Sequence, residues 1–164
     1  MAKHKEEKTN VMRVLEQKKI SYTPHANDPG DGPAPDGITV ARSLGQRPEA
    51  VFKTLVTKGV SGAYYVFDIP VAETLDLKKA AKAVGEKSVA MLPARDLLPL
   101  TGYVHGGCSP VGMKKQFPTV FHQSCLEEET MCVSAGKVGF QVEVRPADLI
   151  ALVRASTADI ICEE

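Results

Sequence analysis

The chain has 164 residues, of which 43% are hydrophobic and 24% charged, with 20 basic side chains balanced by 20 acidic ones. This length suits one domain with a substantial core, and the composition excludes a disordered or membrane-embedded chain. Because the formal net charge is zero, any contact with a nucleic acid has to come from a local basic surface. We therefore expect a single domain over residues 1–164, with residues 1–8 as a flexible tail.

The first eight residues are charged and no apolar segment follows them, so the sequence predicts no signal peptide. No apolar run approaches the roughly 20 residues that a membrane-spanning helix requires. The four cysteines, Cys108, Cys125, Cys132 and Cys162, are widely spaced and form no CxxC pair. We therefore expect free thiols in the reducing cytoplasm, and we predict neither a metal site nor a cofactor.

The N-terminal quarter of the sequence predicts a helix, a short strand and a loop. Thr9 is a suitable N-cap for a helix that ends near Lys19, and residues 20–23 favour a strand. The segment 27–37 is rich in Pro, Gly and Asp, which is typical of a long surface loop. A second short helix is expected to begin at Thr39.

The middle of the chain predicts a β-hairpin followed by a helix. Residues 51–56 and 63–67 are rich in β-branched and aromatic side chains, with a glycine-containing turn between them. Residues 77–84 have helical periodicity, with Asp76 as the N-cap and Gly85 as the C-terminal stop.

The remaining sequence predicts short elements. They are a strand at 88–92, at most one helical turn at 95–98, strands at 119–122, 131–134 and 140–144, and a helix that begins at Pro146. Strands and helices that do not alternate strictly indicate an α/β or α+β domain built on one mixed sheet.

Lys53 is unusual because it lies inside an apolar strand and shares a face with Val51 and Leu55. Burial of an unpaired ammonium is costly, so such a side chain either extends to the sheet edge or points into a polar cavity. In the second case it is a cation that can bind an anion or a carbonyl oxygen. The segment alone leaves both interpretations open.

A second unusual segment is Gly106-Gly107-Cys108-Ser109-Pro110. Adjacent glycines allow backbone N–H groups to approach a ligand, so this loop could bind a phosphate or a carbonyl oxygen. An ordinary turn is the alternative interpretation. Ser134-Ala135-Gly136 and Tyr22 are equally ambiguous. The three small residues could simply form a hairpin turn, and the Tyr22 ring could simply be part of the core.

The sequence offers no obvious nucleophile or general base. No HExxH metal motif and no GxSxG nucleophile elbow is present. Cys108 and His105 are three residues apart in a glycine loop, which seldom holds a thiolate–imidazole pair in the required geometry.

Five segments in the same order resemble YbaK-type aminoacyl-tRNA editing proteins. They are 51–55, 75–83, 101–103, 106–110 with Gly112, Lys114 and Lys115, and 134–137. The resemblance implies a curved mixed β-sheet surrounded by helices. It also implies a cofactor-free hydrolase that removes a wrong amino acid, most often cysteine, from the 3′ end of tRNA(Pro), alongside prolyl-tRNA synthetase.

The resemblance also assigns site residues. The implied catalytic residues are Lys53, Gly106, Ser109 and Pro110, with Gly106 and Pro110 at the ends of a GxxxP loop. The implied substrate-binding residues are Tyr22, Thr54, Gly107, Cys108, Ser134, Ala135 and Gly136. The sequence departs from the family pattern at Gln141, where an aspartate is expected.

In YbaK-type proteins the thiol of the substrate itself attacks the ester, so the missing protein nucleophile agrees with the resemblance. Three rival functions remain open: removal of alanine by water, a non-catalytic module that binds tRNA or prolyl-tRNA synthetase, and a redox or metal protein that uses the cysteines. A local basic surface for tRNA could be formed by Lys78, Lys79, Lys82, Lys87, Lys114, Lys115 and Lys137.

Overall fold

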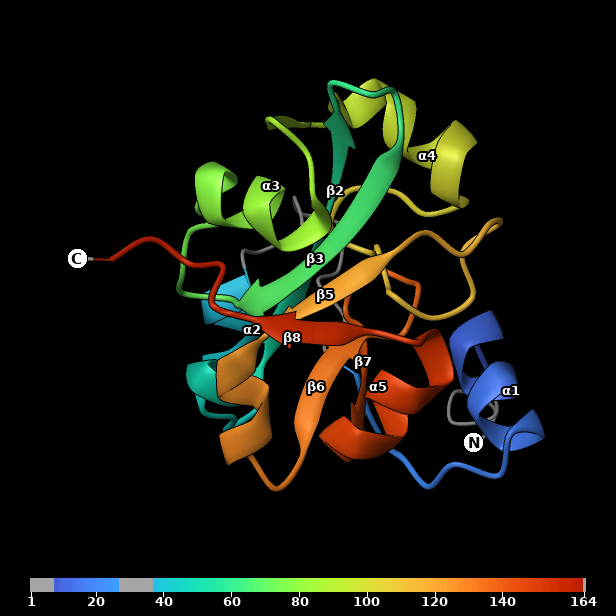
Figure 1. The fold of residues 1–164 in the computed structure, drawn as a ribbon. Helices are drawn as coiled ribbons and strands as arrows, with labels where there is room; N and C mark the ends of the chain where they lie inside the picture. Colours follow the sequence, from blue (N-terminus) through green and yellow to red (C-terminus); the bar gives the residue numbers. More distant parts are fainter. Residues whose placement is uncertain (1–7, 27–36, 164) are drawn as a thin grey trace, which may run out of the picture.

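The computed structural model describes residues 8–26 and 37–163, whose strands form two sheets (Figure 1). The smaller sheet is antiparallel, in the order β1 (Thr23–Ala26), β7 (Phe140–Val144) and β6 (Met131–Ser134). The larger sheet is mixed, in the order β4 (Val89–Met91), β2 (Phe52–Gly59), β3 (Tyr64–Pro70), β5 (Thr119–His122) and β8 (Ser156–Ala158). The predicted α/β class is confirmed, whereas the strands lie in two sheets rather than in one.

Helices surround both sheets (Figure 1). The α-helices are α1 (Asn10–Gln17), α2 (Gly37–Ser43), α3 (Leu77–Val84), α4 (Ala94–Thr101) and α5 (Pro146–Val153), and the 3₁₀ helices are η2 (Pro48–Ala50) and η3 (Gln123–Glu127). Within the described residues, no helix is long and apolar enough to cross a membrane.

The larger sheet buries apolar side chains on both faces. Because side chains alternate along a strand, Val66 of β3 joins the core that packs against α1 and α5, while Phe67 and Ile69 join a second cluster. Ala80 and Ala81 of α3 cover this second cluster. The core between the two sheets also contains Val142 and the other apolar side chains of β6 and β7, and so fixes the smaller sheet against the larger one.

The predicted helix caps are confirmed. The Thr9 hydroxyl accepts the Met12 N–H at 3.2 Å, and the Asp76 carboxylate accepts the Lys78 N–H at 2.9 Å. Gly85 ends α3 with a φ of 76°, a left-handed conformation that glycine adopts without strain.

Several predicted boundaries are wrong, and β2 and β3, for example, each end three residues later than expected. The first strand begins at Thr23 rather than at residue 20, because the Ile20 N–H donates to the Leu15 carbonyl and prolongs the turn after α1. The second helix begins at Gly37, two residues before Thr39. The segment predicted as one turn is the two-turn helix α4.

Helix α4 is longer than predicted because it accommodates Pro99 in its last turn. Proline removes one N–H donor, and here the Thr101 hydroxyl and the Gly102 N–H donate to the carbonyls of Leu97 and Leu98, each at 2.8 Å. The short strand β8 was not predicted, because three residues carry too little periodicity. The predicted loop at 27–37 lies almost wholly outside the described residues.

A carboxyl group is buried in the centre of the larger sheet. Asp68 of β3 pairs with Thr54 of β2, whose hydroxyl donates to the carboxyl at 2.6 Å. Asp68 is fully buried, and desolvation raises the pKa of this carboxyl to about 8, against the smaller opposing effect of the hydrogen bond from Thr54. The folded protein therefore holds this proton at neutral pH.

Because folding raises the pKa of Asp68, the free energy of unfolding should depend on pH. Between the ordinary pKa of 3.8 and the raised value of about 8, the folded chain binds a proton that the unfolded chain releases, so stability falls as pH rises through this window. We expect the free energy of unfolding to decline by up to about 1.4 kcal/mol per pH unit there. In Asp68→Asn this contribution should be absent. Urea denaturation of both proteins at pH 5 and pH 8 measures the difference, and parallel pH profiles would contradict the prediction.

Candidate functional site

A cavity of about 110 Å³ opens where the first residues of β2 meet the loop joining β6 and β7. It is lined by Val40, Val51, Phe52, Lys53, Val71, Gly106, Val133, Ser134, Gly139, Phe140 and Gln141. The walls are mainly apolar, with Lys53, Ser134 and Gln141 as the polar side chains. The cavity has a few times the roughly 30 Å³ that one water molecule occupies in the liquid, so it suits a small side chain.

Among the described residues of this lining, Lys53 is the only one with a charged side chain. It stands opposite Ile69 in the hairpin and is half-buried, and this desolvation lowers its pKa while the charge of Glu73 partly opposes the shift. Among residues 8–26 and 37–163 its ammonium has no hydrogen-bond or ion-pair partner. Lys53 thus lines a cavity, as its second interpretation expected, although the walls of this cavity are mainly apolar rather than polar.

The glycine loop reaches the cavity because it packs against the β6–β7 turn. Gly106 has a φ of 88°, and a Cβ on Gly107 would lie 3.2 Å from the backbone nitrogen of Val138, so this approach requires residues without side chains. The Gly107 N–H donates to the Val104 carbonyl at 2.9 Å. The N–H groups of Gly106 and Cys108 have no hydrogen-bond partner in the described chain, and Gly106 lines the cavity.

Ser134 and Gln141 form the polar wall contributed by the smaller sheet. They are direct partners across β6 and β7, and the Ser134 hydroxyl accepts the Gly136 N–H at 3.0 Å. Gln141 is only 8% exposed, and its Oε1 accepts a hydrogen bond of 2.6 Å from Nε2 of Gln46. Gln46 was missed in the sequence, because it lies in a connection between α2 and η2 with no motif around it.

The other predicted site residues lie outside this lining. Thr54 points to the opposite face of β2, toward Asp68, and the Tyr22 hydroxyl donates to Glu16 at 2.6 Å. The hydroxyl of the fully buried Ser109 accepts the Val111 N–H at 3.2 Å. Pro110, Ala135 and Gly107 are also buried, and Gly136 occupies the turn beside Tyr103. These residues lie outside the cavity lining, behind the side chains that form its walls.

Cys108 is buried, and desolvation raises the pKa of its thiol to about 12. Since the thiolate is the reactive form of cysteine, this environment disfavours Cys108 as a nucleophile. The structure records all four cysteines as free thiols.

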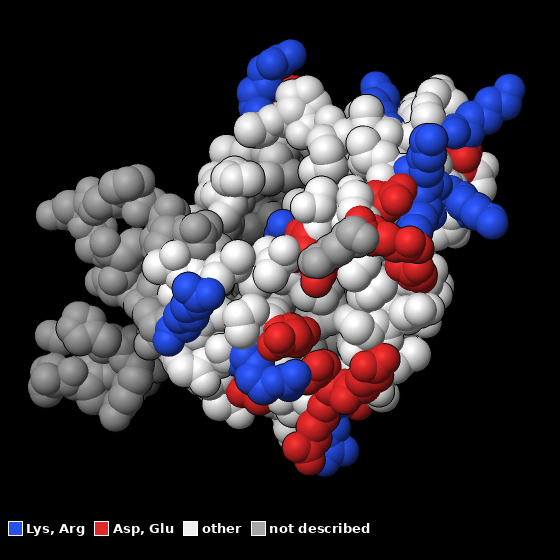
Figure 2. Space-filling view, turned by 90° about the vertical axis from the view of Figure 1, so that its left-hand side faces the viewer, with Lys and Arg blue, Asp and Glu red and all other residues white. Residues whose placement is uncertain are grey.

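Two lysines of the predicted basic surface are engaged by other parts of the chain. Lys79 is engaged by Asp159 at 3.0 Å, and Lys114 donates to the Pro99 carbonyl at 3.3 Å. On the face in Figure 2, basic side chains gather at the upper right, and acidic side chains occupy the centre and the lower edge. This face is therefore mixed in charge.

Comparison with known proteins identifies the family. Residues 32–152 match the family described as the aminoacyl-tRNA editing domain. The chain belongs to this family. The YbaK-type resemblance seen in the sequence is thereby confirmed, as is its class of activity, hydrolysis of the ester between an amino acid and a tRNA.

The similarity to one curated relative extends over the full length of both chains. The chain is 44% identical over 165 aligned positions, covering 100% of both chains, to EbsC of Enterococcus faecalis, whose name describes a Cys-tRNA(Pro)/Cys-tRNA(Cys) deacylase. A crystal structure described as a trans-editing enzyme for prolyl-tRNA synthetase has a TM-score of 0.80 at 24% identity, covering 93% of this chain and 95% of that one. The hypothetical protein APE2540 has a TM-score of 0.83 at 22% identity, covering 93% and 99%. These two structures confirm the fold.

The packing around the editing domain's small-residue turn predicts an intolerance at Gly136. Its φ is 92°, and a Cβ there would lie 3.0 Å from Cε1 of Tyr103 and 3.2 Å from Val11. Gly62 has a similar φ of 95° with nothing within 4 Å of its Cβ position, so it provides a matched control. We expect Gly62→Ala to cost about 1–2 kcal/mol of backbone strain and Gly136→Ala a further ~1–3 kcal/mol of steric clash. Urea denaturation measures both, and equal losses would refute the packing argument.

Proposed function

We propose that the protein is a trans-editing deacylase that hydrolyses Cys-tRNA(Pro), and that the thiol of the substrate acts as the nucleophile. The observation that carries this proposal is the composition of the cavity lining, which among residues 8–26 and 37–163 contains Lys53 but no Asp, Glu, His or Cys. A site without a carboxylate or an imidazole lacks the usual general bases for activating water. The full-length similarity to EbsC supports cysteine as the amino acid.

The proposed reaction uses the cavity for binding and orientation. The sulfur of the cysteinyl group attacks its own ester carbonyl carbon, the C–S bond forms, and the bond from that carbon to the ribose oxygen breaks. The thiol proton goes to the departing ribose oxygen, so the products are tRNA and a cyclic thiolactone, which water later opens. Holding sulfur and carbonyl together can supply several kcal/mol, up to about 7–11 in ideal cases.

In this proposal, Lys53 orients the aminoacyl-adenosine end through its ammonium. The N–H groups of Gly106 and Cys108 stabilise the oxyanion that develops on the carbonyl, since donors placed at developing charge are worth most in a site sheltered from water. Ser109 and Pro110 act indirectly, because they fix the loop that presents those N–H groups. Tyr22, Thr54, Ala135 and Gly136 support the pocket from outside its lining.

Alanine is the second candidate substrate. Either a cysteinyl or an alanyl side chain would fit the small cavity. The neutral Gln141 lies in the cavity wall, at the position where the family pattern has an aspartate. An alanine deacylase of this fold would need water as its nucleophile.

We propose tRNA(Pro) as the carrier and prolyl-tRNA synthetase as the enzyme that supplies it, in the cytoplasm where translation takes place.

The experiment that tests the mechanism compares substrates that differ only at the nucleophile. Cys-tRNA(Pro), 2-aminobutyryl-tRNA(Pro), Ala-tRNA(Pro) and Pro-tRNA(Pro) are given to the purified protein. The 2-aminobutyryl side chain replaces the thiol by a methyl group of similar size. We expect rapid deacylation of the cysteinyl substrate alone. Comparable hydrolysis of the 2-aminobutyryl and alanyl substrates would exclude a substrate thiol and favour the alanine reaction.

Removal of the Lys53 ammonium should abolish most of the catalysis. We expect Lys53→Ala to lower kcat/KM for Cys-tRNA(Pro) by about 100-fold or more, comparable to the loss of one transition-state donor. Lys58→Ala provides the matched control, because Lys58 is an exposed lysine on the same strand. Full activity of Lys53→Ala would show that Lys53 is not part of the reaction.

The lowered pKa of Lys53 predicts where activity is lost at alkaline pH. Because desolvation lowers this pKa, the ammonium should lose its proton, and the enzyme its activity, at a pH below the roughly 10.4 of a free lysine. In Lys53→Arg the guanidinium stays protonated, so the residual activity should have no such alkaline limb. Initial rates, corrected for spontaneous ester hydrolysis, give the profiles. An identical limb in both proteins would contradict the assignment.

A further inference from the structure

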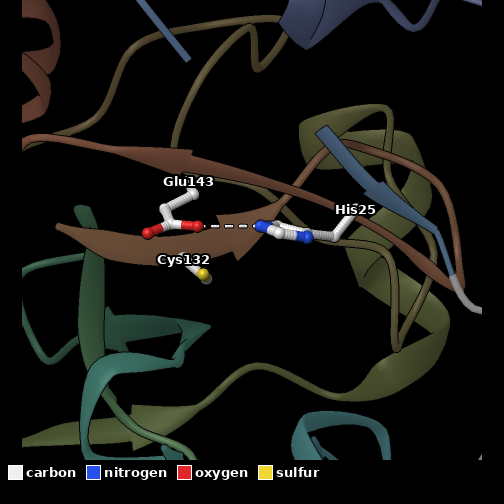
Figure 3. Close-up of side chains that lie close together, drawn as sticks. All are labelled: His25, Cys132 and Glu143. Atoms are coloured by element: carbon white, nitrogen blue, oxygen red, sulfur yellow. Dashed lines mark hydrogen bonds and ion pairs between the residues drawn. The ribbon is translucent and has the colours of Figure 1, made fainter. Parts of the chain in front are cut away.

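A cluster of three different metal-ligand side chains lies on the outer face of the smaller sheet, beside the cavity. His25 of β1, Cys132 of β6 and Glu143 of β7 present ligand atoms that all lie within 4.8 Å of one another (Figure 3). Nε2 of His25 and Oε1 of Glu143 are 2.8 Å apart. The three residues come from three adjacent strands.

Strand pairing accounts for this convergence. Cys132 and Glu143 are direct partners across β6 and β7, so their side chains emerge side by side. His25 pairs with Gln141, two residues from Glu143, and therefore projects from the same face on the other side of β7. The sheet itself holds the three donors together, so little loop ordering is required to assemble them.

Neighbouring polar groups hold two of these side chains in place. The Thr130 hydroxyl donates to the second carboxylate oxygen of Glu143, and Nε2 of Gln46 lies 3.5 Å from the sulfur of Cys132. Groups that hydrogen-bond to the ligands in this way are typical of protein metal sites, where they orient the donors. The Oε1 of Gln46 is buried, and it has no hydrogen-bond partner in the described part of the chain. Such an unpaired buried acceptor needs a ligand or a water to satisfy it.

We propose that His25, Cys132 and Glu143 form a binding site for a divalent transition-metal ion of the zinc class. A tetrahedral site with metal–ligand distances of about 2.0–2.3 Å places its donors roughly 3–4 Å apart. The three donor atoms of this cluster lie within 4.8 Å of one another, so small side-chain movements would bring them to that spacing. One nitrogen, one sulfur and one carboxylate oxygen favour Zn²⁺ or Co²⁺ over Mg²⁺ and Ca²⁺, which take oxygen donors.

The cluster borders an open hollow of about 350 Å³, which is also lined by Gln46, Arg47 and Glu128. Three protein ligands and an accessible fourth position are characteristic of zinc sites that admit a further ligand. A simple His25–Glu143 ion pair would explain their contact. Packing with Ala41, Val51 and Val71 accounts for the burial of the Cys132 thiol, but the Oε1 of Gln46 would still have no partner in the described part of the chain.

The test measures metal binding directly and does not depend on the deacylation activity. Chelator-treated protein is titrated with Co²⁺, whose thiolate complexes give charge-transfer absorption in the near ultraviolet, and Zn²⁺ is then added in competition. We expect one equivalent of Co²⁺ to bind with this absorption and Zn²⁺ to displace it. Cys132→Ser should lose the absorption, and His25→Ala and Glu143→Gln should each weaken binding by at least ~10-fold.

Two further variants separate a built site from adventitious binding by a thiol. Gln46→Ala keeps all three ligands and should weaken Co²⁺ binding by about 10–100-fold, as expected for a group that orients a ligand. Cys162→Ser removes an exposed thiol elsewhere and should bind like the wild-type protein. Far-ultraviolet circular dichroism checks that each variant is folded. Binding that is unchanged in His25→Ala and Glu143→Gln, or absent in the wild-type protein, would overturn the proposal.

Discussion

The register between β6 and β7 determines what the outer face of the smaller sheet can do. With Ser134 opposite Gln141 and Cys132 opposite Glu143, four polar side chains emerge on one face, while Val133 and Val142 enter the core from the other. A shift by one residue would exchange the two sets, because side chains alternate strictly along a strand. The burial of the valines therefore fixes both the polar wall of the candidate cavity and the cluster beside it.

The β2–β3 hairpin places two ionisable groups in poorly hydrated surroundings on its opposite faces. Lys53 is paired with Ile69 at the cavity, and the next pair along the hairpin is Thr54 with Asp68 in the core. Desolvation acts on both in the direction that favours the neutral form, lowering the pKa of the lysine and raising that of the aspartate. Only Lys53 is near enough to an opening to keep part of its hydration, whereas Asp68 is a fully buried core residue.

Much of the fold could be predicted from the sequence, because local signals there agree with the tertiary structure. Strands β5, β6 and β7 and helix α3, with its caps Asp76 and Gly85, have the predicted bounds. Helix α4 was underestimated because Pro99 is a local signal against helix that the Thr101 and Gly102 hydrogen bonds override. The division of the strands into two sheets could not be predicted, since strand periodicity does not reveal which strands pair.

The site was predictable where one residue is locally anomalous. Lys53 is conspicuous within an apolar strand, and two glycines in sequence marked the loop that approaches the β6–β7 turn. Gln46 and His25 gave no such signal, because their roles depend on contacts with Gln141 and Glu143. These partners lie 95 and 118 positions further along the chain, respectively. The alternation along β2 could have excluded Thr54 from the lining, since it must point away from Lys53.

The side chain of Gln46 contacts both the wall of the cavity and the cluster of His25, Cys132 and Glu143. Its Nε2 lies within hydrogen-bonding distance of the Gln141 oxygen in the cavity wall and of the Cys132 sulfur in the cluster. Both contacts use the same amide nitrogen, so a reorientation of Gln46 on one side would alter the contact on the other. Were an aminoacyl group to bind in the cavity and an ion at the cluster, any effect of one on the affinity of the other would be reciprocal.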